Sequence, residues 1–540
     1  MKSLALVSLI TLTCLYGLLA ALIILVCIIA DASVMTGILL SIAGVIVQFL
    51  ISPWLTDLSM RFFYKAKFDA ELPEWLTDFV KEVCDKHGAK MPRIGYINDG
   101  APNAFTYGRT KNDARIVITR GTLELLDEEE AKAVVAHELG HVMHYDMLIM
   151  TVAQIVPLVM YAIYEACTEA AEDTSKSKSK DDSEASGGLM LIGLVAYVLY
   201  IICQLIILWL SRTREYFADS FSVDETGNPS ALAGALVKIG YGLSTAARSE
   251  ASSGHSAVSP TTLGISDAKS SKAMAVCCVS DGSRDPKQSI RNAMKWDMWN
   301  VWAKLYELGS THPLISKRLL AISARCEEFG QTPYITFDEK KPESYVDDFA
   351  RECAISFAPS AALLTGIIFG YVFPVHPEIM IYGFILCMVL SLLKFRYRYP
   401  QNMCPSTVEE LLGEVKVSGI TCIPVEIEGE IIGRGNPGCI FNEDFVLKDK
   451  TGIVMLDYDQ PLRIVNRIFA LFKSEKYFGK ITKVTGWYRR SPVPYIEVKT
   501  METDGVLKKC RTWQFGYVLR WILLAAGVLL LLLELFGSVL

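Results

Sequence analysis

The sequence predicts a multi-span α-helical membrane protein that carries an α+β domain on the cytoplasmic side and a small all-β module of OB-like type. Three observations lead to this fold class. The 540-residue chain is 51% hydrophobic with a mean hydropathy of +0.31, which exceeds what a soluble core requires. Several apolar stretches have the length of a membrane span. Between the last two of them the pattern changes to the alternation of β-strands.

Seven apolar stretches approach the ~20 residues that a helix needs to cross a bilayer. The first is longer than the apolar region of a signal peptide, about 7–15 residues, and a second span follows at once, so we interpret it as a retained anchor. The fifth and sixth are short, and the last contains Glu534. The stretches are Leu4–Ala30, Val34–Trp54, Met147–Tyr164, Leu189–Leu210, Ala358–Phe373, Ile379–Leu393 and about Val518–Leu540.

Basic residues near the span ends orient the chain, because Lys and Arg stay on the cytoplasmic side. Clusters follow spans two, four and six and precede span seven, whereas the turns at 31–33 and 374–378 contain no Lys or Arg. All clusters therefore fall on one side, and the segment between spans two and three faces the cytoplasm. The basic residues are Arg61, Lys65, Lys67, Arg212, Arg214, Lys394, Arg396, Arg398, Arg511 and Arg520.

Charge and cysteine usage argue against nucleic-acid binding and against cysteine-based structural sites. The net charge is −6 and basic residues cluster only beside the membrane, so the lipid bilayer is an expected partner and nucleic acid is not. The 14 cysteines include several inside spans and form no CxxC pair. A disulfide framework and a cysteine-based zinc site are both disfavoured.

The segment between spans two and three predicts three strands, RIGYI (93–97), NAFTYG (103–108) and ARIVIT (114–119). A helix follows, because Asp127 and Glu130 have the spacing of a capping box, and we expect it to run through His144. The polar, low-complexity stretch 168–188 predicts a mobile outer connection between spans three and four.

Two further regions follow span four. The segment 244–288, rich in Ser, Ala, Gly and Asp, predicts a disordered insertion, and helical periodicity returns over 292–308. From Gly413 to about Thr503 alternating patterns such as GEVKVSG and CIPVEIEGEIIG predict the OB-like barrel, tethered between spans six and seven. Its sequence shows no concentrated basic charge, so a structural or protein-contacting role is favoured over nucleic-acid binding, with no identified partner.

The stretch AVVAHELGHVMHYD (133–146) contains the candidate metal-binding and catalytic residues. Residues four apart on a helix share a face, so His137 and His141 can bind one ion. Glu138 lies about 100° round the helix, within reach of an attacking water. These residues can also be ordinary helix residues near a membrane. With only seven histidines in the chain, a chance H-E-x-x-H match is on the order of one in a hundred, so zinc is favoured.

A catalytic zinc usually has three protein ligands and one open position. His144 is the nearest third candidate but points partly away from the pair. Glu215 is favoured, because spans three and four form an antiparallel hairpin that returns the segment after Leu210 to the zinc helix. Asp219, one turn further, can orient a ligand histidine. The alternative for the segment with Glu215 and Asp219 is a juxtamembrane helix whose charged side chains are solvated and bind no metal.

HELGH, the membrane hairpin and SRTREYFAD (211–219) resemble the HtpX-type integral-membrane zinc metalloproteases, in the wider family that also contains the CaaX prenyl endopeptidase. APNAF (101–105) and STHPLISKRL (310–319) support the resemblance, which covers roughly residues 1–325. It implies a cytoplasmic zincin-like α+β protease domain. Spans five to seven and the β module lie outside the usual short form, and His144 and the Ser-rich insertion depart from the family pattern.

The resemblance implies that His137, His141 and Glu215 bind one zinc ion per subunit, with Glu138 as the base. It also implies that the amide of Asn103 holds substrate backbone, although Pro-Asn alone is a turn signal. His312 would donate to the oxyanion, although Thr-His-Pro alone is more often a helix-entry turn. Arg318 would pair with an active-site carboxylate, and a surface arginine is the alternative.

The predicted reaction is peptide-bond hydrolysis at the cytoplasmic membrane face, with unfolded polypeptides and misfolded membrane proteins as substrates in quality control. One alternative is a CaaX-type prenyl endopeptidase, for which the sequence shows no prenyl chamber. Another is a non-catalytic scaffold with a structural metal site, which would need no base at Glu138. Intramembrane cleavage is disfavoured, since HELGH precedes the apolar run.

The sequence predicts five regions. The expected divisions are an N-terminal transmembrane hairpin 1–54, a zinc metalloprotease domain 55–355 that includes hairpin 147–210 and the insertion 244–288, a transmembrane hairpin 356–398, the β-rich OB-like module 399–512 and a C-terminal transmembrane segment 513–540.

Overall fold

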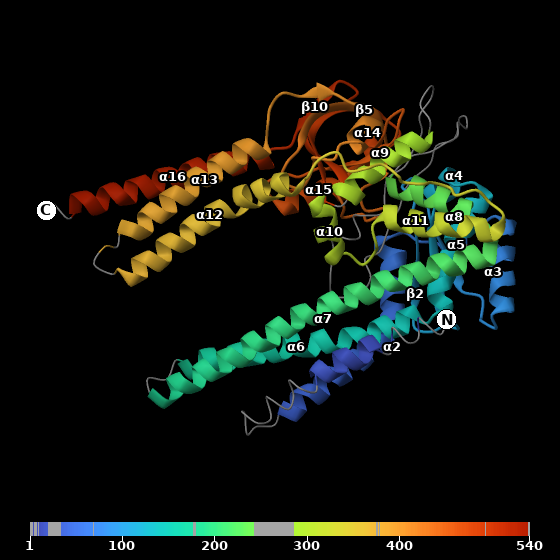
Figure 1. Cartoon of the computed structure of the whole chain (residues 1–540), viewed down its shortest axis with the longest axis horizontal. Helices are drawn as coiled ribbons and strands as arrows, with labels where there is room; N and C mark the ends of the chain where they lie inside the picture. Colours follow the sequence, from blue (N-terminus) through green and yellow to red (C-terminus); the bar gives the residue numbers. More distant parts are fainter. Residues whose placement is uncertain are drawn as a thin grey trace.

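Two groups of long helices extend from one side of a folded unit (Figure 1). The first group contains α2 (Val34–Phe63), α6 (Asp146–Ser175) and α7 (Lys180–Thr226). The second contains α12 (Val346–Val372), α13 (Glu378–Arg398) and α16 (Thr512–Gly537). This computed structural model describes residues 4, 8, 10–19, 34–68, 70–175, 180–241, 286–373, 376, 378–491 and 493–537.

Within these described residues, five helices are long and apolar enough to cross a membrane: α6, α7, α12, α13 and α16. They contain predicted spans three to seven, which are thereby confirmed as helices of spanning length. The second predicted span lies in α2, which packs beside α6. Of the first, most lies outside the described residues, and a short apolar helix remains at Ile10–Leu19.

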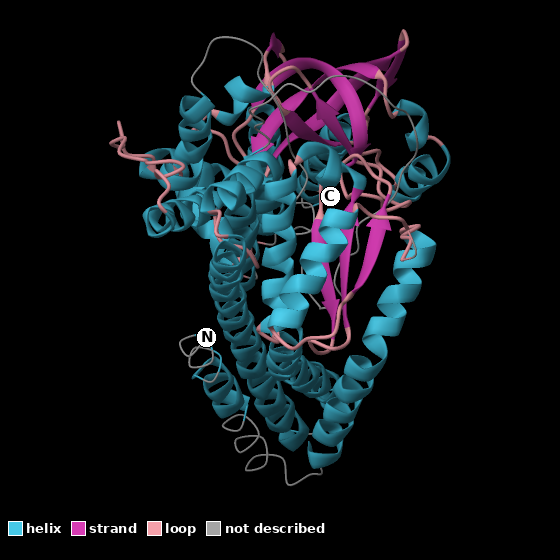
Figure 2. Ribbon diagram, turned by 90° about the vertical axis from the view of Figure 1, so that its right-hand side faces the viewer, coloured by secondary structure: helices cyan, strands magenta, loops and turns pink. Residues whose placement is uncertain are grey.

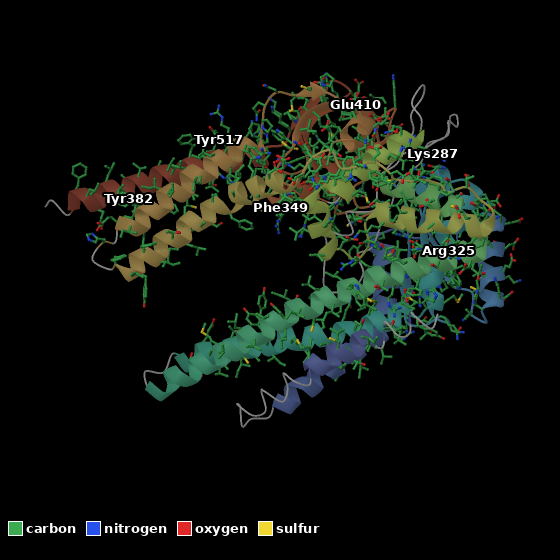
Figure 3. All side chains as sticks on the ribbon, viewed as in Figure 1. Lys287, Arg325, Phe349, Tyr382, Glu410 and Tyr517 are labelled. Atoms are coloured by element: carbon green, nitrogen blue, oxygen red, sulfur yellow. The ribbon has the colours of Figure 1, made fainter. Side chains whose placement is uncertain are left out.

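The second group of helices packs through small residues. A methyl group added at Gly366 of α12 would lie 2.6 Å from the Cα of Gly383 in α13, so only glycine allows this approach. Close backbone contact of this kind drives helix association in lipid, where the hydrophobic effect does not act between helices. Tyr382 of α13 is 49% exposed, whereas the ring of Tyr517 of α16 packs against Phe395 of α13, with centroids 5.3 Å apart (Figure 3).

The connection predicted at 168–188 is largely helical, which corrects the expectation of a mobile loop. Helix α6 continues to Ser175 and α7 begins at Lys180, so only residues 176–179 fall outside the described part. Ala, Glu and Lys in this stretch are good helix formers, which polarity alone did not reveal. The predicted insertion 244–288 lies outside the described residues except for its last three, which begin α9 (Pro286–Trp299).

The predicted strands of the α+β domain form one sheet. They are β1 (Arg93–Ile97), β2 (Ala104–Gly108) and β3 (Ala114–Thr119), in the order β1-β3-β2. Strand β3 is central, parallel to β1 and antiparallel to β2. Among the described residues β2 pairs only with β3, so its other edge is open. The surrounding helices are α3 (Glu74–Lys86), α4 (Arg120–Leu125) and α5 (Glu128–Met143).

Helix α5 begins where the sequence predicts. The side chain of Asp127 accepts from the amide of Glu130, and the side chain of Glu130 accepts from the amide of Asp127, which completes the capping box. The helix ends at Met143, with His144 as its C-cap. Val135 and Leu139 pack on the sheet residues Ile116 and Ile118, and this core fixes the helix that carries the two histidines.

The helices after α7 are short. They are α8 (Pro229–Leu236), a π-helical turn (Val237–Tyr241), α9, α10 (Val301–Leu308), α11 (Ile315–Arg325) and a 3-10 turn (Cys326–Phe329). The single helix predicted over 292–308 is two helices, because Asn300 interrupts it. Its side chain accepts from the amide of Trp302 and caps α10.

The C-terminal module closes into a ring of strands (Figure 2). Strand β5 pairs with β6, β6 with β7, β7 with β9, β9 with β8, and β8 with β5, and only the pair of β7 and β9 is parallel. The module's elements are β4 (Cys404–Pro405), α14 (Val408–Leu412), β5 (Ile423–Arg434), β6 (Phe445–Lys448), β7 (Ile453–Asp457), α15 (Arg463–Phe472), a 3-10 turn (Ser474–Tyr477), β8 (Ile481–Arg490), β9 (Pro494–Thr503) and β10 (Val506–Lys509).

One predicted strand of this module, GEVKVSG at 413–419, is wrong. The segment lies against α9 and α10 instead of joining the sheet. Trp296 Nε1 donates to the carbonyl of Val417 over 2.6 Å, and Asn300 Nδ2 donates to the carbonyl of Val415 over 2.7 Å. These side chains satisfy the backbone groups that a neighbouring strand would otherwise bind.

The module shares a hydrophobic core with the α+β domain. One continuous cluster joins Ala133 of α5 and Val223 of α7, through Met294 of α9, to Val425 and Val484 of the barrel. Burial on this scale excludes a flexible attachment between the two parts, because separating them would expose the whole cluster to water. The module is therefore packed into the α+β domain as well as connected to α13 and α16 at its two ends.

A buried ion pair lies at this junction. Arg490 Nη2 at the end of β8 is 2.9 Å from Asp297 Oδ1 of α9, and both side chains are almost fully buried. The guanidinium lies over the Trp296 ring, 4.5 Å from its centroid, and donates to the carbonyls of Ala293 and Leu412. Each charge thus has direct protein partners.

We predict that Asp297→Ala lowers the free energy of unfolding by about 3–5 kcal/mol, because it leaves the Arg490 guanidinium buried without its carboxylate. The measurement is equilibrium unfolding of the detergent-solubilised protein. Lys483→Ala is the control, since Lys483 and Glu426 form an exposed pair, 2.7 Å apart, on the same module. A wild-type midpoint for Asp297→Ala would contradict the prediction.

Candidate metal centre

Two helices bring three candidate ligands together. The 3.6-residue period of α5 stacks His137 and His141, whose Nε2 atoms are 3.3 Å apart. Helix α7 continues unbroken from its apolar part into Arg212–Asp219 and places Glu215 opposite them. Glu215 Oε2 lies 3.5 Å from His137 Nε2, and Oε1 lies 3.5 Å from His141 Nε2.

These separations fit a tetrahedral metal ion. Bonds of ~2.0–2.1 Å to zinc place neighbouring tetrahedral ligand atoms roughly 3.3–3.4 Å apart. The three candidate ligand atoms lie within 4.8 Å of one another. Glu215 Oε2 is buried and makes no hydrogen bond of good geometry within the described part of the chain, so a cation would satisfy it.

Each histidine is held from behind by a carboxylate. His137 Nδ1 lies 3.0 Å from Asp219 Oδ1, and His141 Nδ1 lies 2.7 Å from Asp146 Oδ2. Such contacts fix the tautomer that leaves Nε2 free for a metal. Asp219 is among the residues predicted from the sequence, whereas Asp146 is not. Asp146 follows the end of α5, and its spacing from His141 matches no ligand motif.

Two buried arginines compensate these carboxylates. Arg318 of α11 donates from Nε and Nη2 to Asp219, with a 2.9 Å Nε contact, and its Nη1 lies 3.1 Å from Glu215 Oε2. Arg214 of α7 pairs with Asp146 and donates to the Ser8 hydroxyl. For Arg318 the sequence left two alternatives, a pair with an active-site carboxylate or a surface arginine, and the structure shows the pair. For Arg214 the sequence did not indicate a structural role.

The cluster has the charge for a divalent cation. The carboxylates of Glu138, Asp146, Glu215 and Asp219 and the guanidiniums of Arg214 and Arg318 are all buried. With neutral imidazoles, four negative and two positive groups leave a net charge of −2. A buried deficit of this size is unfavourable unless protonated imidazoles or a bound cation offset it.

The pKa values of His137 and Arg318 also reflect the negative charge of this cluster. Burial lowers the pKa of His137, but hydrogen bonds to Asp219 and Glu215 outweigh it and raise that pKa to about 10. The pKa of Arg318 is also raised, because Asp219 and Glu215 outweigh the effect of burial. The surroundings thus favour positive charge where the two imidazoles meet.

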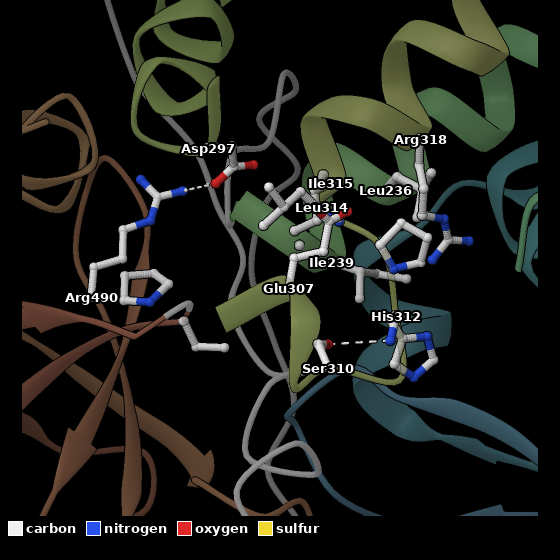
Figure 4. Close-up of a pocket in the computed structure, with 14 residues that line it drawn as sticks. Leu236, Ile239, Asp297, Glu307, Ser310, His312, Leu314, Ile315, Arg318 and Arg490 are labelled. Atoms are coloured by element: carbon white, nitrogen blue, oxygen red, sulfur yellow. Dashed lines mark hydrogen bonds and ion pairs between the residues drawn. The ribbon is translucent and has the colours of Figure 1, made fainter. Parts of the chain in front are cut away.

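The remaining predicted residues lie around this centre. His312, which precedes α11, has Nδ1 3.0 Å from Glu215 Oε2, and Figure 4 shows its ring beside a cavity that Arg318 also lines. Asn103 lies directly before β2, and its backbone N–H donates to the hydroxyls of Thr119 and Thr122. The hydroxyl of Thr106 donates to the carbonyl of Glu138 over 3.4 Å, so β2 runs beside the HELGH turn.

His144 lies outside the cluster. Its ring packs edge-on against Phe217 and Phe221, with centroids 6.4 and 5.7 Å away. As the C-cap of α5 it is turned from the face that presents His137 and His141. The structure therefore does not bring this alternative ligand to the candidate site.

Known proteins share this region. The sequence profile of peptidase family M48 matches residues 71–326. A protease HtpX homolog of Methanothermobacter thermautotrophicus is 43% identical over 201 residues, which are 37% of this chain and 71% of that protein. A protease HtpX homolog of Aeropyrum pernix is 26% identical over 296 residues, which are 54% of this chain and 86% of that protein.

A crystal structure of S. mikatae Ste24p is also similar. It is 20% identical, and the match covers 44% of this chain and 59% of that chain with a TM-score of 0.31. This likeness is too distant to bear on the fold. Residues 327–540, which include the barrel, lie beyond the matched profile.

We predict that Asp219→Asn weakens zinc binding about 10–100-fold, because the amide keeps the shape but removes the charge that orients the His137 ring. Competition with a chelator measures the affinity. Asp224→Asn on the same helix is the control, since Asp224 is 56% exposed and pairs only with Arg325 among the ion pairs of the described residues. Equal affinity for both variants would show that Asp219 does not support the metal.

Proposed function

Since the chain belongs to peptidase family M48, whose HtpX-type members are membrane metalloproteases, we propose that His137, His141 and Glu215 hold the zinc ion of its endopeptidase site. The observation that carries the proposal is the position of Glu138. It lies between the two histidines on α5, and its side chain is buried in the same cluster. A purely structural metal site would not require a carboxylate there.

The zinc ion, when bound, polarises a carbonyl and makes a water molecule acidic enough to attack at neutral pH. The chain's own residues do the rest. Glu138 takes the proton of the attacking water and passes it to the leaving amine. His312, beside Glu215, is placed to donate a hydrogen bond to the oxyanion that develops on the substrate. Asp219 and Asp146 keep both ligand imidazoles in position.

The open edge of β2 supports binding of an extended substrate. Asn103 directly precedes this strand, and Thr106 in its middle contacts the backbone of Glu138. A peptide that adds to the edge would run past the candidate base. Backbone hydrogen bonds of this kind carry little sequence preference, so unfolded segments of membrane proteins are the proposed substrates. Quality control of misfolded membrane proteins is the corresponding role.

The proposed site faces the cytoplasm. Arg212 near the end of the apolar part of α7 donates to the carbonyls of Glu307 and Ser310, and Arg520 of α16 donates to Ser391 of α13. Arg212 thus contacts the folded unit directly, and Arg520 lies in the part of α16 that follows its start at Thr512, next to the barrel. The excess of positive charge at this end of the spans supports its cytoplasmic location.

The barrel is proposed to be OB-like, spanning about 399–512. Its ring order of β5, β6, β7, β9 and β8, with one parallel pair inside the ring, supports a five-stranded Greek-key barrel. Along the chain, helix α15 lies between β7 and β8. Together with the zincin-like α+β domain and the membrane helices, it completes the proposed architecture.

We predict that Glu138→Gln lowers kcat by on the order of 10²–10⁴-fold while zinc stays bound, because the amide cannot accept the proton of the water. The test uses detergent-solubilised protein, an unfolded polypeptide substrate and measured zinc content. Glu129→Gln is the control on the same helix, with a side chain that is 56% exposed.

Three outcomes would contradict this function. Wild-type protein that binds zinc but cleaves no polypeptide would favour the scaffold alternative. Cleavage confined to prenylated peptides would favour a CaaX-type prenyl endopeptidase. Zinc binding and activity that both survive Glu215→Ala would show that Glu215 is not a ligand.

A further inference from the structure

A cavity of about 120 Å³ lies directly beside the candidate metal centre (Figure 4). His312 and Arg318, which both contact Glu215, line the end of the cavity nearest that centre. Leu236, Leu314 and Ile315 line its α-helical side. The opposite wall comes from the barrel, through Val493 and Pro494 between β8 and β9. Residues of two distant parts of the sequence thus enclose one space.

The barrel wall is held in a fixed position. Arg490, three residues before Val493, forms the buried ion pair with Asp297 across the junction. Pro494 begins β9, which pairs with β7 and β8 inside the ring. The shared hydrophobic cluster prevents the barrel from moving away as a separate body. The position of Val493 relative to His312 is therefore set by folding.

The residues that line the cavity favour binding of an apolar group. The charged residues at the cavity already have partners, since Asp297 pairs with Arg490 and Glu307 pairs with Lys317 at 2.5 Å. The remaining walls are largely aliphatic. An engineered cavity of ~150 Å³ takes benzene, so this slightly smaller cavity suits one branched aliphatic side chain such as leucine.

We propose that this cavity binds the substrate side chain next to the bond that is cut, and that Val493 of the barrel determines its size. The inference rests on the proposed endopeptidase function and deepens it. Backbone pairing along β2 would accept many substrate sequences. The side chain that fits the cavity would then determine which peptide bond is cut. The barrel would then act as part of the substrate site, beyond the region that matches the family profile.

The test compares peptides that differ only in having Leu or Ala beside the cleaved bond. For wild-type protein we expect higher kcat/KM with Leu, because the side chain leaves water. Val493→Phe fills the cavity and should reduce the Leu-to-Ala ratio by about tenfold or more. Val506→Phe is the matched control. It lies on β10, paired with the far end of β9, and is 61% exposed.

The outcomes separate the two proposals. If the wild-type protein cleaves no peptide, the proposed function fails. If it cleaves with a preference that Val493→Phe does not change, only the role of the cavity fails. Unfolding midpoints of both phenylalanine variants check the fold. Should Val493→Phe lower the midpoint, Val493→Ala replaces it, with an expected shift of preference from Leu toward Phe.

A second inference concerns α15, whose outer face is apolar. The opposite face, with Asn466, Phe469 and Ala470, is buried against the barrel. Basic residues flank the exposed face at Arg463, Arg467 and Lys473. The exposed apolar side chains, 39–72% accessible, are Leu462, Ile464, Val465, Ile468, Leu471 and Phe472.

Both ends of α15 lie beside the ends of membrane helices. Before α15, Gln460 hydrogen-bonds the carbonyl of Lys509 and the amide of Arg511, and α16 begins at the next residue. After α15, Glu475 lies 3.7 Å from Lys65, just past the end of α2. The rings of Phe63 and Phe441 also meet here, with centroids 5.7 Å apart.

These contacts place α15 beside the end of α2 and the start of α16. It lies on the side of the folded unit from which the long helices extend (Figure 1). We infer that α15 lies in the lipid headgroup region, with its apolar side chains among the acyl chains and its basic residues near anionic headgroups. An apolar face bordered by Lys and Arg is the pattern of an interfacial helix.

A photoreactive phenylalanine analogue at Phe472 tests this inference in full-length protein in anionic lipid nanodiscs. We expect severalfold more crosslinking to lipid than from the same analogue at Glu410, an exposed residue of α14 on the module (Figure 3). Tyr382 of α13, 49% exposed and also labelled there, provides the positive control. Equal lipid crosslinking at Phe472 and Glu410, or crosslinking of Phe472 to a second chain, would overturn it.

Discussion

Four buried carboxylates gather at one site, three of them in contact with an imidazole, and this is the constraint on which the rest of the structure depends. Such a cluster is unfavourable in a protein interior unless opposite charge surrounds it. Arg214 and Arg318 supply part of that charge, each from a helix outside α5. The remaining deficit matches a divalent cation. The positions of α5, α7 and α11 relative to one another are therefore fixed by electrostatics as well as by the apolar core beneath them.

The long α7 connects this cluster with the membrane. A single helix carries the apolar span and Glu215, so the ligand has no hinge between itself and the lipid-embedded part. Asp146 at the first turn of α6 provides the corresponding link for His141. A site built on both helices of a membrane hairpin keeps a constant distance from the bilayer surface, so under the proposed function a polypeptide would have to reach that surface to be cut.

The barrel changes how the site is enclosed. It contributes to the main hydrophobic cluster, pairs Arg490 with Asp297, and supplies Val493 to the cavity beside His312. Helix α15 lies on the same module, close to the ends of α2 and α16. The module thus contacts the α+β domain on one side and adjoins the ends of membrane helices on another. This arrangement explains physically why the module follows a membrane hairpin and precedes the last span.

The sequence by itself determined what depends on local spacing. The capping box at Asp127, the strands 93–97 and 114–119, the five spans and the pairing of His137 with His141 follow from short-range periodicity. The approach of Glu215 followed from the hairpin topology. Tertiary structure alone decided the contacts of Asp146, Arg214 and Val493, and it turned segment 413–419 from a predicted strand into a backbone acceptor for Trp296 and Asn300. Those contacts join residues whose distance in space depends on the complete chain path, which no local pattern encodes.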